Sequence, residues 1–213
     1  MVTSERGFSL IELMIVTAIS SALLGSAVAV SNQVQRGYSH ELDDAAVQQE
    51  ARYALDWIAA TIAPAGSNPY DIATSACPAS GTPFAAFRLD PDGNGIDDDI
   101  RVQADVNPPN GLLTGLSGAC NESGEDVTIG RDAAANTITR RDVATDAAPV
   151  AVTDGVFTAL RFTYLTSGRV VTATPDAIAF VLVSLTGRSR SRDPHTGQFT
   201  TFTYQSEIRV RSR

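Results

Sequence analysis

The sequence has no lysine and only two cysteines and two histidines among its 213 residues. Cys77 and Cys120 do not form a CxxC pair, and too few potential ligands accompany them for a structural zinc site. His40 and His195 belong to no recognisable catalytic pattern, and neither a nucleophile elbow nor a P-loop is present. The sequence therefore gives no support to an enzyme. The formal net charge of −8 argues against general nucleic-acid binding.

One long stretch of the chain is almost without charge. The 23 residues from Phe8 to Val30 are predominantly apolar, with Glu12 as the one charged residue, and would form a helix about 34 Å long, enough to cross a hydrocarbon core of about 30 Å. A carboxylate in such a span costs about 2.5–3.5 kcal/mol, so one that is kept usually has a partner. The leader that ends at Gly7 is too short for a secretory signal, whose apolar stretch precedes the cleavage site. A cut after Gly7 leaves the apolar stretch on the mature protein.

Gly7 comes directly before this run, Phe8 begins it and Glu12 lies within it. This arrangement resembles the cleavage and methylation motif of type IV prepilins and type II secretion pseudopilins. The resemblance implies that a prepilin peptidase cuts after Gly7 and that the new amino group of Phe8 is methylated. It also implies that Glu12 meets the N-terminus of a neighbouring pilin or pseudopilin in a helical filament. A plain signal anchor, in which Glu12 is incidental, is the alternative.

Helix signals continue beyond the apolar run. Apolar residues recur every three or four positions, at Val34, Tyr38, Leu42, Ala45, Ala51, Leu55, Ile58 and Ile62. Pro64 and Gly66 end this pattern. We therefore expect one helix from residue 8 to about 63. Residues 8–30 would lie in the membrane or filament core, and residues 31–63 would form an amphipathic half.

Residues 64–213 are predicted to form one β-rich head domain of roughly 150 residues. The strand-like segments are 84–89, 100–106, 127–129, 137–141, 157–165, 177–186 and 199–211. Residues 64–83 look irregular, and residues 188–198 look like a long hairpin loop. Both faces of 180–185 are mostly apolar, so this strand should lie centrally in the sheet, with one face on the long helix. The predicted fold is the α+β pilin-like fold, a long N-terminal helix packed on a C-terminal antiparallel β-sheet.

The C-terminal half adds a weaker resemblance. An alternating strand, an arginine-rich segment at 187–197 and a last strand ending in Arg-Val-Arg-Ser-Arg resemble the larger minor pilins (PilW-like) and the related J-type pseudopilins. The resemblance implies a single-pass inner-membrane precursor with a periplasmic C-terminal domain, which an inner-membrane assembly platform places in a pilus or pseudopilus. A minor pilin that helps to start type IV pilus assembly is the leading interpretation. A pseudopilin at the tip of a type II secretion pseudopilus is the runner-up.

A third interpretation is a filament-borne adhesin or DNA-binding module. Its support is the segment Arg188–Arg213, which holds six of the 16 arginines. The alternatives are contact with an acidic subunit, or simply an exposed hairpin and an edge strand whose charges limit aggregation. Nucleic acid is the least favoured partner.

The two cysteines also permit a structural prediction. If the head lies outside the cytoplasm, a disulfide between Cys77 and Cys120 is expected. It would close a loop of 44 residues and contribute about 4 kcal/mol in the chain-entropy model. Two free buried thiols are the alternative.

The segment 90–99 has the character of a calcium loop. Asp90, Asp92 and Asn94 occupy alternate positions before Gly95, as at positions 1, 3 and 5 of an EF-hand loop, where Ile96 would offer its carbonyl and Asp98 would stand at position 9. Arg101 stands where the bidentate glutamate belongs and helical flanks are absent, which excludes a full EF-hand. The sequence requires no cofactor, but this loop could hold a structural calcium ion. Another carboxylate would complete the ligand set; the candidates are Asp105, Glu122, Glu125 and Asp126. The alternative is a solvated turn built on Asn94-Gly95.

Overall fold

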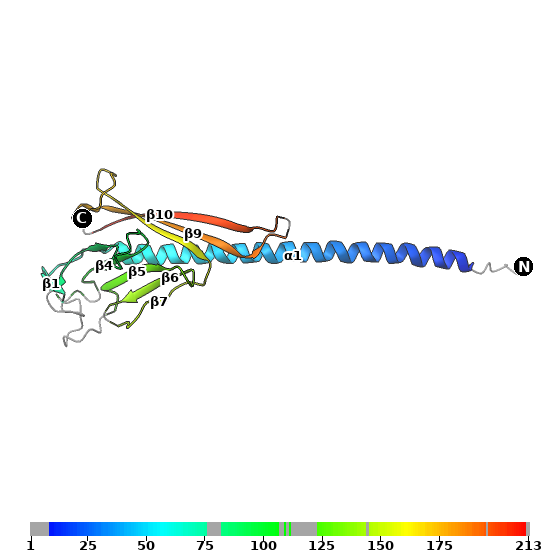
Figure 1. Cartoon of the computed structure of the whole chain (residues 1–213), viewed down its shortest axis with the longest axis horizontal. Helices are drawn as coiled ribbons and strands as arrows, with labels where there is room; N and C mark the ends of the chain where they lie inside the picture. Colours follow the sequence, from blue (N-terminus) through cyan, green and yellow to red (C-terminus); the bar gives the residue numbers. More distant parts are fainter. Residues whose placement is uncertain are drawn as a thin grey trace, which may run out of the picture.

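The structure is a computed structural model that describes residues 9–75, 82–106, 109, 111, 123–143, 145–194 and 196–211. One helix, α1 (Leu10–Ile62), runs for 53 residues, or about 80 Å, and carries a β-rich head at its C-terminal end (Figure 1). The helix is continuous through Gly37. It ends at Ile62, ahead of Pro64, which has no N–H for the helical ladder, and of Gly66, whose positive φ turns the chain. The predicted α+β architecture is confirmed.

The head contains a five-stranded and a three-stranded antiparallel sheet, with a small two-stranded ribbon. The five-stranded sheet has the order β3-β4-β5-β6-β7, and the three-stranded sheet has the order β10-β9-β8. The strands of the first sheet are β3 (Phe87–Leu89), β4 (Ile100–Gln103), β5 (Asp126–Asp132), β6 (Thr137–Asp142) and β7 (Val150–Ala151). Those of the second are β8 (Phe157–Leu165), β9 (Phe180–Arg192) and β10 (Phe199–Arg209). The ribbon pairs β1 (Thr74–Ser75) with β2 (Thr82–Pro83).

The core lies where the last third of α1 meets the two larger sheets. Val47, Ala51, Ile58 and Ile62 of the helix are fully or almost fully buried. In β9 every second residue from Val181 to Ser189 is buried, and the residues between them are half-buried. The prediction of a central strand that packs on the helix is thus confirmed. A side chain at Gly187 would meet the Phe157 ring at 3.3 Å, so this part of β9 lies close to its neighbours.

The hairpin of β9 and β10 extends along α1 toward its N-terminal end, beyond the other strands (Figure 1). Its tip is fixed to the helix around His40, whose Nδ1 lies 3.3 Å from Ser191 Oγ and whose Nε2 lies 3.4 Å from Thr200 Oγ1. Ser191 Oγ also donates to Asp43 Oδ2 at 2.8 Å. The loop predicted for 188–198 is therefore too long, because residues 188–192 belong to β9. β9 continues to Arg192: the buried Ser189 accepts from the Thr200 N–H of β10, Ser191 contacts the helix, and Arg190 and Arg192 are exposed.

Other sequence predictions are corrected in detail. In the predicted apolar face of the helix, Val34, Tyr38 and Leu42 are more than half exposed, and Ala45 is exposed too. Among the described residues, the hairpin contacts this part of α1 on another side, at His40 and Asp43. Residues 175–177 form a short 3-10 helix before β9. The strands β1, β2 and β7 have two residues each and were not predicted. The predicted span of β8 is confirmed.

Candidate functional site

In the N-terminal turn of α1, two side chains each accept a hydrogen bond from a backbone N–H that has no partner within the helix. Ser9 Oγ accepts from the Ile11 N–H at 3.3 Å, and Glu12 Oε2 accepts from the Ser9 N–H at 2.9 Å. This is a capping box, in which the carboxylate also opposes the positive end of the helix dipole. Glu12 therefore has a local partner within its own chain. It is exposed, so a second partner from another chain can also reach it.

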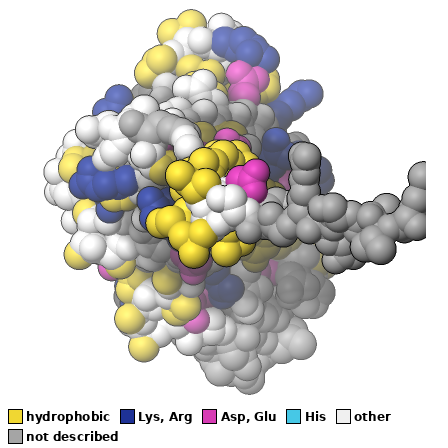
Figure 2. All heavy atoms as spheres, turned by 90° about the vertical axis from the view of Figure 1, so that its right-hand side faces the viewer, with side chains coloured by type: hydrophobic (Ala, Val, Ile, Leu, Met, Phe, Trp, Pro, Cys, Tyr) yellow, Lys and Arg dark blue, Asp and Glu magenta, His cyan; other side chains and the backbone are white. Residues whose placement is uncertain are grey.

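Beyond this cap the helix presents apolar side chains on all sides. Its large hydrophobic residues before position 31 are 52–78% exposed: Leu10, Ile11, Leu13, Met14, Ile15, Val16, Ile19, Leu23, Leu24, Val28 and Val30. Figure 2, which looks along α1 from its N-terminal end, shows this apolar end in front of the head. The helix is long and apolar enough to cross a membrane, and its most apolar window is wholly unburied.

Three hydroxyl groups in this part of the helix donate to carbonyls of the same helix. Thr17 Oγ1 donates to the Leu13 carbonyl at 3.0 Å, and Ser21 Oγ donates to the Thr17 carbonyl at 2.6 Å. Ser26 Oγ donates to the carbonyl of Leu23. These bonds hide the hydroxyls from a surrounding apolar medium. The surface from Leu13 to Val30 is thus suited to lipid or to other apolar helices.

Residues 3–28 match the family model of the prokaryotic N-terminal methylation motif. The chain carries the N-terminal motif of type IV pilins and pseudopilins. The match supports prepilin-type cleavage, N-terminal methylation and a membrane-anchored precursor that assembles with other pilins, and this class consists of structural filament subunits. No curated protein and no solved structure matches the chain significantly. Among the predicted site residues, Gly7 and Phe8 lie outside the described residues, as do Cys77 and Cys120.

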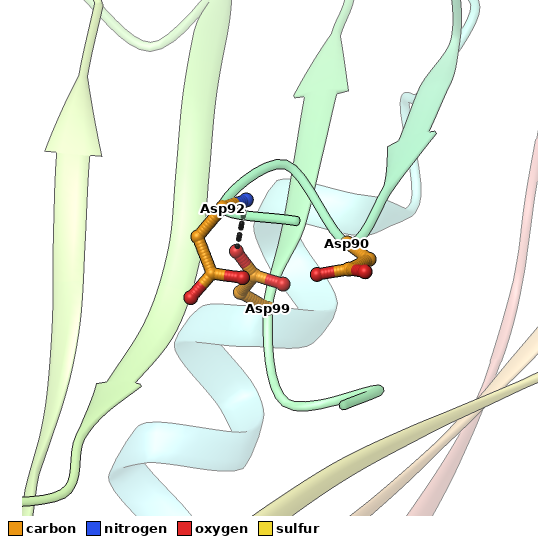
Figure 3. A group of neighbouring side chains, drawn as sticks. All are labelled: Asp90, Asp92 and Asp99. Atoms are coloured by element: carbon orange, nitrogen blue, oxygen red, sulfur yellow. Dashed lines mark hydrogen bonds between the residues drawn. The ribbon is translucent and has the colours of Figure 1, made fainter. Parts of the chain in front are cut away.

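A second candidate site lies on the head, in the loop between β3 and β4. Leu89 pairs with Ile100 across this hairpin. Asp90 comes directly after Leu89 and Asp99 directly before Ile100, so the two aspartates lie on opposite sides of the loop. The loop then folds back on itself through positive φ angles at Asp90, Gly93 and Gly95. As a result, carboxylate oxygens of Asp90, Asp92 and Asp99 lie within 4.8 Å of one another (Figure 3).

Asp90 and Asp92 also organise the backbone of this loop. The Asp90 carboxylate accepts from the Gly95 N–H at 2.9 Å and from the Asn94 N–H at 3.0 Å, and these bonds lower its pKa. The Asn94 side chain is used locally, because its oxygen accepts from the Ile96 N–H at 2.7 Å. Sequence reasoning placed Asn94, Ile96 and Asp98 with Asp90 and Asp92. The structure instead brings Asp99 to the two aspartates, and Asp98 is not part of this carboxylate group.

Asp99 differs from its two neighbours in being buried. Its side chain lies against Gly130 of β5, where a Cβ would stand 3.2 Å from the Asp99 Cβ, so the missing side chain makes room for it. The pKa of Asp99 is raised to about 6, chiefly by burial; the hydrogen bond from the Asp92 N–H opposes the shift, and the charges of Asp92 and Asp90 add to it.

The other carboxylates that were considered as ligands have different partners. Asp126 forms a two-pronged ion pair with Arg101, with both N···O distances 2.6 Å. Glu125 Oε1 accepts from the Val106 N–H, and Asp105 Oδ2 accepts from the Gly111 N–H. These bonds lie near the ends of β4 and β5. Glu122 lies outside the described residues.

The arginine-rich segment is partly engaged within the head. Arg190 pairs with Glu50 of the helix at 3.3 Å and with Asp154. The guanidinium groups of Arg188 and Arg192 lie over the Phe199 ring, 4.9 and 4.7 Å from its centroid. Three of the six arginines in this segment thus stabilise the hairpin or join it to the rest of the head.

Proposed function

We propose that this protein is a minor pilin, a structural subunit that enters a type IV pilus and helps to start its assembly. The observation that carries the proposal is the bare apolar half of α1 directly behind the methylation motif. In a filament, other helices would cover this surface in place of lipid, so close side-chain packing and the Glu12 pair would hold the subunits together. The head, with two main sheets, is larger than a small major subunit needs, which favours a minor component.

Glu12 is the residue proposed to guide this assembly. Its exposed carboxylate would pair with the methylated amino group of Phe8 from an adjacent subunit, away from water. Removing one partner of a buried charge pair costs about 3–5 kcal/mol. A Glu12→Ala variant should therefore enter filaments at least about 100-fold less than the natural protein while its leader is still cleaved. Immunoblots of sheared filaments and of membranes measure both quantities.

Glu12→Gln separates the intermolecular role from the local cap. Glutamine can accept the Ser9 N–H as the carboxylate does, but it has no charge for the amino group of Phe8. It should assemble as poorly as Glu12→Ala if the charge pair matters. Normal incorporation of both variants would overturn the role of Glu12. Normal incorporation of Glu12→Gln alone would assign the residue to helix capping.

The pilus and the secretion pseudopilus are distinguished by a deletion. Loss of a minor pilin should abolish surface filaments and leave protein secretion intact. A secretion defect with normal pili would instead identify the protein as a pseudopilin.

A further inference from the structure

The acidic loop on the head combines three converging carboxylates with an unused buried oxygen. Asp99 is only 6% exposed, and its Oδ2 accepts from the Asp92 N–H at 3.1 Å. Its Oδ1 is buried and accepts no hydrogen bond from any residue that the structure describes. Figure 3 shows this second oxygen turned toward the carboxylate of Asp90. A buried carboxylate oxygen with no donor is costly unless something positive binds it.

We propose that Asp90, Asp92 and Asp99 bind a calcium ion. Three carboxylates give the group three negative charges and six oxygens, and oxygen is the ligand that hard cations prefer. Two oxygens that each lie about 2.3–2.6 Å from calcium can be up to about 5 Å apart. The oxygens of these three aspartates lie within 4.8 Å of one another, so one ion can reach all three side chains. The hydrogen bonds that Asp90 and Asp92 already accept leave further lone pairs on their oxygens.

Calcium fits this loop better than magnesium does. Calcium takes six to eight ligands in irregular arrangements, whereas magnesium demands near-ideal octahedral geometry and gives up its waters reluctantly. The ligands here come from one short loop and one strand end, at the exposed Asp92, the half-buried Asp90 and the buried Asp99. Because the three carboxylates differ in burial, an ion bound by them would face solvent on the side of Asp92 and could take water ligands there. The ion would join the loop to the five-stranded sheet, far along the chain from Glu12.

Thermal melting of the full-length protein in detergent micelles tests the proposal. At a calcium concentration about 100 times Kd, the melting temperature should rise by about 5–10 °C above that in chelator. Magnesium at the same concentration should produce a much smaller rise. Isothermal titration with calcium chloride should show one bound ion.

The variants Asp99→Asn and Asp90→Asn should lose the calcium-dependent rise and the titration heat. Asp97→Asn is the matched control, because it removes one charge from the same loop at an exposed side chain outside the carboxylate group. It should keep the rise. Asp99→Asn retains an oxygen for the Asp92 N–H and removes a buried charge, so it should fold in chelator. Equal melting of the natural protein in calcium and chelator, or a full calcium response in both site variants, would overturn the proposal.

Discussion

Asp99 is a charged residue held in a place that favours its neutral form. Its pKa of about 6 lies above the ordinary value of 3.8 because of burial first and of the neighbouring aspartates second. A carboxylic acid whose folded pKa is raised contributes stability below its unfolded pKa, and this contribution is lost as the pH rises through the folded pKa. Without calcium, the head should therefore lose stability between about pH 4 and pH 6 on account of this residue.

The Asp99→Asn variant isolates this effect. In chelator at pH 7 it should melt a few degrees above the natural protein, because the asparagine carries no buried charge. The difference should shrink toward pH 4, where Asp99 is protonated. Melting curves across this pH range measure it, and parallel pH profiles for the two proteins would contradict it.

Single residues differ in how far their roles could be predicted from the sequence. Glu12 was recognisable because its motif is local, within a few positions of Gly7. Asp90 and Asp92 were also found by local spacing. Asp99 was missed, because its position depends on the pairing of Leu89 with Ile100 and on the space above Gly130, which belongs to another strand. No pattern within the loop contains that information.

For helices and strands, too, the sequence predicts local structure better than it predicts contacts between distant segments. The strand β8 and the helix α1 were predicted almost to the residue, because each is long and strongly patterned. The helix face was predicted correctly from Ala51 onward but not at Val34 and Tyr38, since periodicity shows which residues share a side and not how far the head reaches. In β9 the arginines suggested a loop, although the alternate small residues pack on the helix.

The difference between the two parts of α1 can be measured with a matched pair of leucines. Leu55 is 7% exposed in the core, whereas Leu42 is 53% exposed on the same helix. Leu55→Ala should lower the free energy of unfolding of the head by about 2–5 kcal/mol through the lost contacts and the cavity. Leu42→Ala should change it by less than about 0.5 kcal/mol. Denaturant unfolding in detergent measures both, and equal losses would contradict the packing described.

The whole molecule joins a β-rich head to an apolar rod, and the proposed cleavage after Gly7 would fix where the rod begins. The native protein should start at Phe8 and carry one methyl group on its amino terminus. Intact mass measurement of protein from membranes or filaments checks this. A chain that still begins with Met1, or one that begins beyond Val30, would contradict retention of the apolar half.

Between Glu12 and Arg36 the helix has no charged side chain. Hydrophobic attraction is non-directional, and the side-chain ridges of an apolar helix repeat at every turn, so several offsets along a common axis offer similar contact. Apolar contact alone would not select one offset between two parallel rods. In an assembled fibre the rise per subunit would then be set by features at the two ends of the rod, the lone carboxylate at one end and the bulk of the folded head at the other.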